Sequence, residues 1–200
     1  MKEKKRLLLI GNGPIPINIS DKVNKFDYVM RINRMTNFIT TGPRIDGVFI
    51  GAYKDFREFY KGGEFKEYFK TAKEVFLTDN LKKWFTNWNE FLTQDQWDNI
   101  QIMDFKYNKE NVGTAFPTTS ICVLNVLTSF PIWYENYEIW ICGITVNGRE
   151  ELMKTGTAWS KTLHKFDGKL EEEFLKKLLK ENKIKRLIPE IDDNIYNSER

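Results

Sequence analysis

The chain has 200 residues, which is the size of one domain. It carries 31 Lys and Arg against 28 Asp and Glu, and the resulting net charge of +3 is too small for a nucleic-acid scaffold. Hydrophobic residues make up 41% and charged residues 30%, so the composition excludes general disorder.

The N-terminal residues do not read as a secretory signal. The charged start of the chain is followed by a short apolar stretch, Leu7–Ile10, and then by Gly-Asn-Gly-Pro. Nowhere does an apolar run approach the ~18–20 residues of a membrane helix, so we expect a cytoplasmic protein with no integral membrane span. Two cysteines, Cys122 and Cys142, and a single histidine cannot form a Cys/His zinc site, and we expect both thiols to be buried and reduced.

Strand-like and helix-like segments alternate along the chain. The strands are expected at Arg6–Ile10, Asp27–Ile32, Asp46–Ile50, Glu74–Thr78, Ile100–Met103, Tyr137–Cys142 and Ile184–Ile188. The helices are expected at Phe56–Lys70, Leu81–Leu92, Thr118–Phe130 and Gly168–Glu181. This alternation predicts one three-layer α/β/α Rossmann-like domain over residues 1–189, with a mostly parallel sheet and a polar tail at 190–200.

Ligands of such sheets bind beyond the carboxyl ends of the strands, where the strand order reverses. The loops after Ile10, Ile32, Ile50 and Cys142, and the turn before Thr118, are therefore the candidate site.

The first of these loops is Gly11-Asn12-Gly13-Pro14. Its glycines would let backbone amides approach a phosphate, and the Asn12 amide can both donate and accept hydrogen bonds. Pro16 stands where the dinucleotide fingerprint needs a third glycine, and no Lys-Ser/Thr follows as in a Walker loop. The alternative interpretation is a plain tight turn with a structural Asn.

Three further groups could bind substrate. Thr118, Thr119 and Ser120 begin a helix whose first amides could hold a carboxylate or phosphate, or the side chains could simply cap it. Asn33 follows a strand and could contact a donor or form a turn. Arg31 could instead pair with Asp27 or Asp46.

The order of these motifs resembles the sialyltransferases of glycosyltransferase families 29 and 42. The resemblance lies in Gly-Asn-Gly, then Asp27-Tyr-Val-Met-Arg-Ile-Asn33, then Pro117-Thr-Thr-Ser120, then the strand that ends at Gly143-Ile144, and last His164 ahead of a Glu-rich helix. The matching pieces run from about Leu8 to Ile188. The resemblance implies the sialyltransferase-like variant of the GT-A fold.

The resemblance also implies an activity: inverting transfer of a sugar, expected to be sialic acid, from a CMP-sugar to a glycan acceptor in bacterial surface polysaccharide synthesis. Such a donor needs no metal or further cofactor, in keeping with the lack of an Asp-x-Asp motif. His164 would be the general base, oriented by Asp167 or Glu171, and residues 145–165 would be a lid loop. The substrate-binding residues implied are Gly11, Asn12, Gly13, Arg31, Asn33, Thr118, Thr119, Ser120 and Gly143.

The chain departs from the family pattern in places. Ser120 stands where the small motif usually carries Gly, and no Tyr follows Gly143 to hold the leaving phosphate. The alternative is a catalytically altered member that binds a nucleotide or sugar as an accessory protein, and a third reading is an unrelated α/β nucleotide-binding protein. The aromatic residues Phe65, Tyr68, Phe69, Trp84, Phe85 and Trp88 are expected in the core, while peripheral membrane association and homo-oligomer formation stay open.

Overall fold

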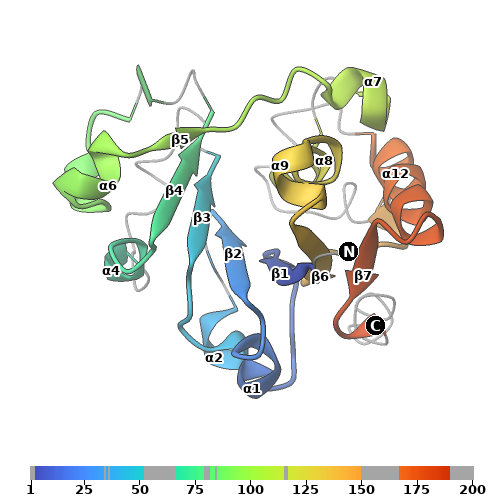
Figure 1. The fold of residues 1–200 in the computed structure, drawn as a ribbon, viewed down its shortest axis with the longest axis horizontal. Helices are drawn as coiled ribbons and strands as arrows, with labels where there is room; N and C mark the ends of the chain where they lie inside the picture. The colour runs from blue at the N-terminus through green and yellow to red at the C-terminus, as the bar shows by residue number, and fades with distance from the viewer. Residues whose placement is uncertain are drawn as a thin grey trace.

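The computed structural model describes residues 3–33, 35, 37–51, 66–78, 82–83, 85–114, 117–149 and 167–189. In these residues a seven-stranded sheet runs in the order β5-β4-β3-β2-β1-β6-β7, and every neighbouring pair is parallel (Figure 1). The strands are β1 (Lys5–Ile10), β2 (Tyr28–Ile32), β3 (Gly47–Ile50), β4 (Glu74–Leu77), β5 (Gln101–Ile102), β6 (Tyr137–Cys142) and β7 (Ile184–Arg186). All seven expected strands are confirmed.

Within the described parts of the chain, two long helices and several one-turn helices accompany the strands. The long ones are α8 (Thr119–Ser129) and α12 (Gly168–Lys180), which confirms the helices expected in those two places. Pro131 ends α8 and at once begins the short helix α9, because proline fits the first turn of a helix. The short helices are α1 (Ser20–Val23), α2 (Phe38–Thr41), α4 (Lys66–Phe69), α6 (Gln94–Asp98), α7 (Asn108–Val112), α9 (Pro131–Tyr134) and the 3-10 turn η1 (Trp88–Glu90).

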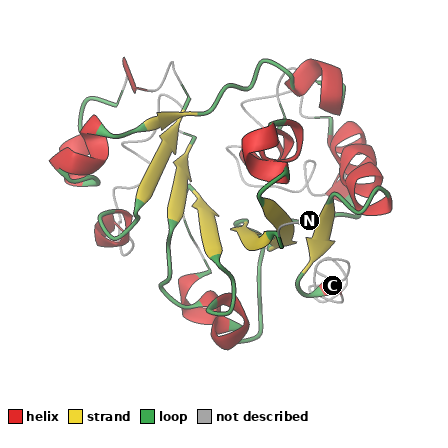
Figure 2. Ribbon diagram, viewed as in Figure 1, coloured by secondary structure: helices red, strands yellow, loops and turns green. Residues whose placement is uncertain are grey.

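Side chains alternate across the sheet and build a core on each face. Leu7 and Leu9 of β1 pack into a core with residues of α8 and α12. Leu8 and Ile10 point the other way, into a core with Val23 of α1. Figure 2 shows the strands as a band between α7, α8, α9 and α12 on one side and α1, α2, α4 and α6 on the other. The expected three-layer α/β arrangement is confirmed.

The strand order fixes where the chain reverses direction across the sheet. From β1 the chain adds β2, β3, β4 and β5 outward on one side, and then returns to place β6 against the other side of β1. Ile10 at the end of β1 lies opposite Cys142 at the end of β6. The switch point of the fold is therefore beyond these two residues.

The expected helix Leu81–Leu92 is wrong over its second half. Thr86 and Asn87 form a turn, and η1 follows. Phe85 and Phe91 are buried with their ring centres 5.8 Å apart, so tertiary packing overrides the helical spacing of the aromatic residues. The next helix along the chain, α6, is a separate element. It begins with a capping box between Thr93 and Gln96.

Other expectations fall partly outside the described residues. Of the helix expected at Phe56–Lys70 only residues 66–70 are described; Lys66–Phe69 is helical and Lys70 lies in a turn. Within the aromatic group, Phe69 and Phe85 are buried and Tyr68 is exposed. The lid loop is described only up to residue 149, and residues 190–200 lie outside. Both cysteines are buried and free, as expected. Among the described residues, no helix is both long and apolar enough to cross a membrane.

Candidate functional site at the β1–β6 switch point

The first glycine loop is bound to the loop that follows β6. The Gly11 amide donates to the Cys142 carbonyl, and the Gly13 amide donates to the Gly143 carbonyl, both at 2.9 Å. A Cβ atom on Gly11 would lie 2.3 Å from the Gly143 oxygen. The two glycines therefore serve the close approach of two backbone segments, and the amides that we expected to face a phosphate bond to carbonyls of the protein instead.

A residue that the sequence did not indicate, Asn37, completes this junction. Its side-chain amide is buried and donates to the carbonyls of Gly11 and Gly13, at 2.9 and 2.8 Å. Gly143 has a φ of 63°, and its own Cβ would approach the Asn37 amide at 3.2 Å. Gly143 thus belongs to this junction through its backbone, and its positive φ and close contacts favour glycine at this position.

Arg31 acts inside the protein. Its guanidinium is fully buried and donates to the Arg44 carbonyl at 2.9 Å, to the Thr41 hydroxyl at 2.9 Å and to the Gly42 carbonyl at 2.5 Å. It also lies 4.5 Å from the centre of the Phe38 ring. Burial lowers the pKa of this guanidinium to about 10. Arg31 thereby fixes α2 and the turn after it against β2.

Both carboxylates suggested as partners for Arg31 are bound elsewhere. Asp27 accepts a hydrogen bond from the Arg6 amide at 2.6 Å. Asp46 accepts hydrogen bonds from Arg44 at 2.9 Å and from Lys73 at 2.6 Å. The structural alternative for Arg31 therefore holds, but through carbonyls, a hydroxyl and an aromatic ring in place of the expected ion pair.

Asn33 joins the ends of two strands to the start of α8. It has a φ of 47°, and its side-chain oxygen accepts a hydrogen bond from the Gly51 amide at 2.8 Å. A Cβ on Gly51 would lie 2.8 Å from the methyl group of Thr119. Asn33 therefore has the turn role that its place after a strand allows, and the contact through Gly51 brings Asn33 and Thr119 close together.

The start of α8 is bound to a buried ion pair. The Thr118 amide donates to Glu171 at 2.6 Å, and the Thr118 hydroxyl donates to the other oxygen of that carboxylate at 3.0 Å. Arg149 bonds to the same carboxylate through Nε at 3.0 Å and through Nη2, which also donates to the Thr118 hydroxyl at 2.9 Å. Glu171 is fully buried and Arg149 is 3% exposed. This helix start thus holds a carboxylate of the protein itself, where we expected a carboxylate or phosphate of a ligand.

The general base of the hypothesis, His164, lies outside the described residues. Of its two candidate partners, Asp167 caps α12 by accepting a hydrogen bond from the Leu170 amide at 3.0 Å, and Glu171 bonds to Thr118 and Arg149. Both groups therefore already have structural roles.

Three residues of the predicted set are exposed or half-buried at this edge. Asn12 is exposed at the tip of the first loop, and Thr119 and Ser120 are half-buried at the start of α8, where the first amides of a helix have no partner within it. Among the residues that the structure describes, no group of three or more His, Cys, Asp or Glu side chains could hold a metal ion.

Comparison with known proteins finds no protein-family model that matches the chain and no curated protein with a significantly similar sequence. The interpretation of this site therefore depends on its own residues and geometry.

Proposed function

We propose that this protein is a sialyltransferase-like glycosyltransferase with a GT-A-type fold, which transfers a sugar from a CMP-sugar donor to a glycan acceptor with inversion and without a metal. The donor would bind at the β1–β6 switch point. Asn12 and the Thr119–Ser120 helix start would hold its polar groups, and His164 would take the proton of the acceptor hydroxyl.

One observation carries this proposal. Motif residues far apart in the sequence gather at one edge of the sheet: Gly13 bonds to Gly143, and Asn33 bonds to Gly51, which lies against Thr119. This is the edge at which doubly wound sheets bind their ligands. The motif order of the sequence and the strand order of the sheet, taken together, support a ligand site at this edge.

A second candidate function is favoured by the contact between Glu171 and Thr118. Because a carboxylate of the protein accepts the Thr118 amide, one of the groups expected to bind the donor's own carboxylate is occupied. A catalytically altered member of the family, which binds a nucleotide or sugar without turning it over, would tolerate this change.

Nucleotide binding tests the donor site. We expect CMP to raise the melting temperature more than UDP, GDP, ADP or NAD, because ligand at about 100 Kd stabilises a protein by roughly 2.7 kcal/mol. Asn12→Ala should weaken CMP binding while the protein stays folded, since Asn12 is exposed. Equal shifts with every nucleotide, or no shift with CMP, would contradict the donor assignment.

Sugar transfer separates the two candidates. With CMP-sialic acid and a galactoside acceptor, His164→Ala should keep CMP affinity and lose most transfer. The rate of the parent should fall as pH drops through the histidine pKa, because only neutral imidazole accepts a proton. If the parent binds CMP but turns over no donor, the accessory function is the correct one.

A further inference from the structure

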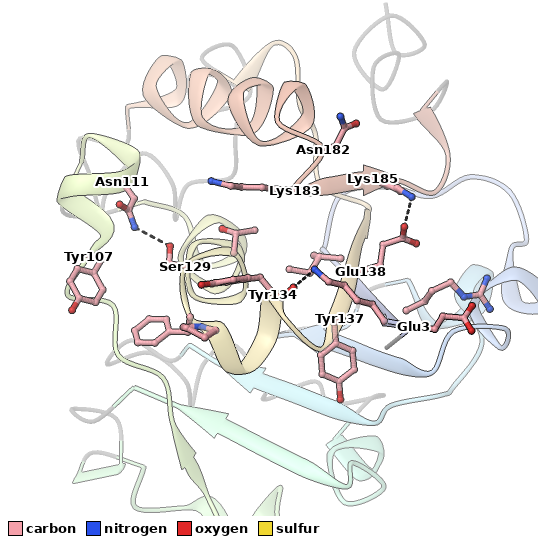
Figure 3. Close-up of a pocket in the computed structure, with 16 residues that line it drawn as sticks. Glu3, Tyr107, Asn111, Ser129, Tyr134, Tyr137, Glu138, Asn182, Lys183 and Lys185 are labelled. Carbon is pink, nitrogen blue, oxygen red and sulfur yellow. Dashed lines mark hydrogen bonds and ion pairs between the residues drawn. The ribbon is translucent and has the colours of Figure 1, made fainter. Parts of the chain in front are cut away.

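The two edges of the sheet differ in what they offer a ligand. At the amino edge, where β1, β6 and β7 begin, a cavity of about 1200 Å³ lies beside α9 and the ends of α7 and α8 (Figure 3). Its lysines have carboxylate partners: Lys185 binds Glu138, and Lys183 binds Glu181 at 2.9 Å. With the negative ends of α8 and α12, the charges balance there, so charge favours no class of ligand. At the carboxyl edge, by contrast, one buried side chain controls an exposed loop.

That side chain is Asn37, which holds the backbone on both sides of Asn12. Its side-chain amide has two hydrogens, and it donates to the Gly11 carbonyl at 2.9 Å and to the Gly13 carbonyl at 2.8 Å. Asn37 is 8% exposed, whereas Asn12 is exposed at the tip of the loop. A single buried group thus fixes the two residues that flank the exposed one.

The geometry of the peptide groups turns the Asn12 amide away from Asn37. The described residues contain no cis peptide bond, and in a trans peptide the carbonyl and the following amide point in opposite directions. Because the Gly11 carbonyl points at Asn37, the Asn12 amide points the other way. The peptide after Asn12 is fixed as well, since the Gly13 amide donates to the Gly143 carbonyl at 2.9 Å. The orientation of Asn12 is therefore set from both sides.

A chain of hydrogen bonds connects Asn37 to the buried Arg31. Arg31 donates to the Thr41 hydroxyl at 2.9 Å, and a guanidinium can only donate. The hydrogen of that hydroxyl therefore goes to its other neighbour, the Asn37 carbonyl, at 2.5 Å. Thr41 is fully buried, so water does not compete for these bonds. Arg31 thus helps to hold the backbone of Asn37 behind the loop, although it lies inside the protein.

We propose that Asn37 is the positioning residue of this site, which fixes the Gly11–Gly13 loop so that Asn12 faces a ligand. The proposal rests on the donor site proposed above, in which Asn12 binds the nucleotide, and adds the residue that sets its orientation. Position 37 requires an amide, because two carbonyls need two donors. A carboxylate of the same shape offers only acceptors and would repel both carbonyls.

Asn37→Asp tests this requirement with little change in shape. At pH 7.5 the new carboxylate faces two carbonyls, so we expect CMP to bind the variant at least tenfold more weakly than the parent in calorimetric titration of the full chain. Burial raises the pKa of such an acid, and its protonation restores one donor. At pH 5 the ratio of the variant Kd to the parent Kd should therefore be smaller than at pH 7.5. The ratio also cancels the titration of CMP itself.

Gln96 provides a matched control far from the site. Its side-chain amide is also 8% exposed and also donates to two carbonyls, those of Phe69 and Ala72, at 2.9 and 2.7 Å. Both carbonyls precede β4, which lies three strands from β1 in the sheet. Gln96→Glu should lower the free energy of unfolding, as Asn37→Asp does, and should leave the Kd for CMP at the parent value. Equal losses of affinity in the two variants would overturn the proposal.

Hydrogen exchange measures the position of the loop without a ligand. The Gly13 amide, which is bonded to the Gly143 carbonyl, should exchange at least tenfold faster in Asn37→Asp than in the parent. In Gln96→Glu its exchange should stay at the parent rate. If Asn37→Asp does not fold, Asn37→Ala takes its place in both measurements, because it removes the two donors without adding a charge.

The possible outcomes separate this proposal from the donor assignment. If Asn37→Asp binds CMP as the parent does, or if exchange at Gly13 is unchanged, Asn37 does not position the loop. If the parent itself does not bind CMP, the donor assignment is wrong, and the exchange rate at Gly13 alone decides the role of Asn37. Faster exchange would then support the proposal for a ligand other than CMP.

Discussion

The backbone amide of Thr118 donates to the Glu171 carboxylate at 2.6 Å across 53 residues of sequence. This bond ties the start of α8 to the first turn of α12, and Arg149 closes the arrangement from the loop after β6. Three segments at the carboxyl edge of the sheet are thereby held together by one buried carboxylate.

Removing one member of the buried ion pair should be strongly destabilising. We expect Arg149→Met to lower the free energy of unfolding by ~3–5 kcal/mol, because Glu171 would remain as a buried charge without its cation. Urea unfolding measures this. Glu173→Gln, at an exposed position on the same helix, is the control and should change stability little. If Arg149→Met lowers the free energy of unfolding as little as the control does, the ion pair is solvated.

Two glycines of the loop after β6 form a matched comparison. Gly143 and Gly148 have φ values of 63° and 70°, so alanine at either position should cost ~1–2 kcal/mol for the left-handed conformation. Only at Gly143 does the new Cβ meet backbone, the carbonyl oxygens of Gly11 and Gly13 at 3.0 and 3.1 Å. Gly143→Ala should therefore be the more destabilising in thermal unfolding, and equal losses would contradict the junction described here.

Asp46 should make stability depend on pH in the acid range. Burial alone would raise the pKa of Asp46, but hydrogen bonds from Lys73 and the Val29 amide, with the charge of Arg44, lower it overall. The stabilisation that Asp46 gives the folded protein is complete above the ordinary aspartate pKa of about 3.9. It is lost as the pH falls from there through the lower pKa that Asp46 has in the folded protein. Urea unfolding between pH 2 and 6 should show a shallower acid loss for Asp46→Asn than for the parent. Asp21→Asn, an exposed change, should follow the parent.

Neither cysteine should react while the protein is folded. Burial raises the pKa of the Cys122 thiol to about 12, and Cys142 is fully buried at the end of β6. At pH 8 a thiol reagent such as DTNB should modify both residues only in denaturant. Rapid modification without denaturant would show that one of these sites opens locally.

The centre of the sheet was predictable because Leu7–Ile10 of β1 and Gly47–Ile50 of β3 are continuous runs without polar side chains, which is the pattern of strands buried on both faces. The one-turn helices α1 and α2 were not, since four residues cannot display a helical period. The aromatic spacing around Phe85 was misleading for a different reason, because short buried turns place rings inward as well as a helix does.

The location of the candidate site was predictable from the sequence, but most of the contacts within it were not. Sequence order located the loops, but the bonds from Asn37 and Arg149 join distant segments and leave no local pattern. Glu171 did leave a signal. It precedes Phe174 and Leu175 by three and four residues, so it lies on the apolar face of α12, where a carboxylate needs a buried partner.

The central position of β1 has a consequence for synthesis on the ribosome. One side of β1 pairs with β2, but the other side pairs with β6, from Lys5 against Tyr137 to Ile10 against Cys142. Until residue 142 has left the ribosome, the nascent chain therefore carries an unpaired hydrogen-bonding edge in the middle of its future sheet. Such an edge can pair with another nascent chain, so the first two thirds of this protein should need protection by a chaperone until the final third arrives.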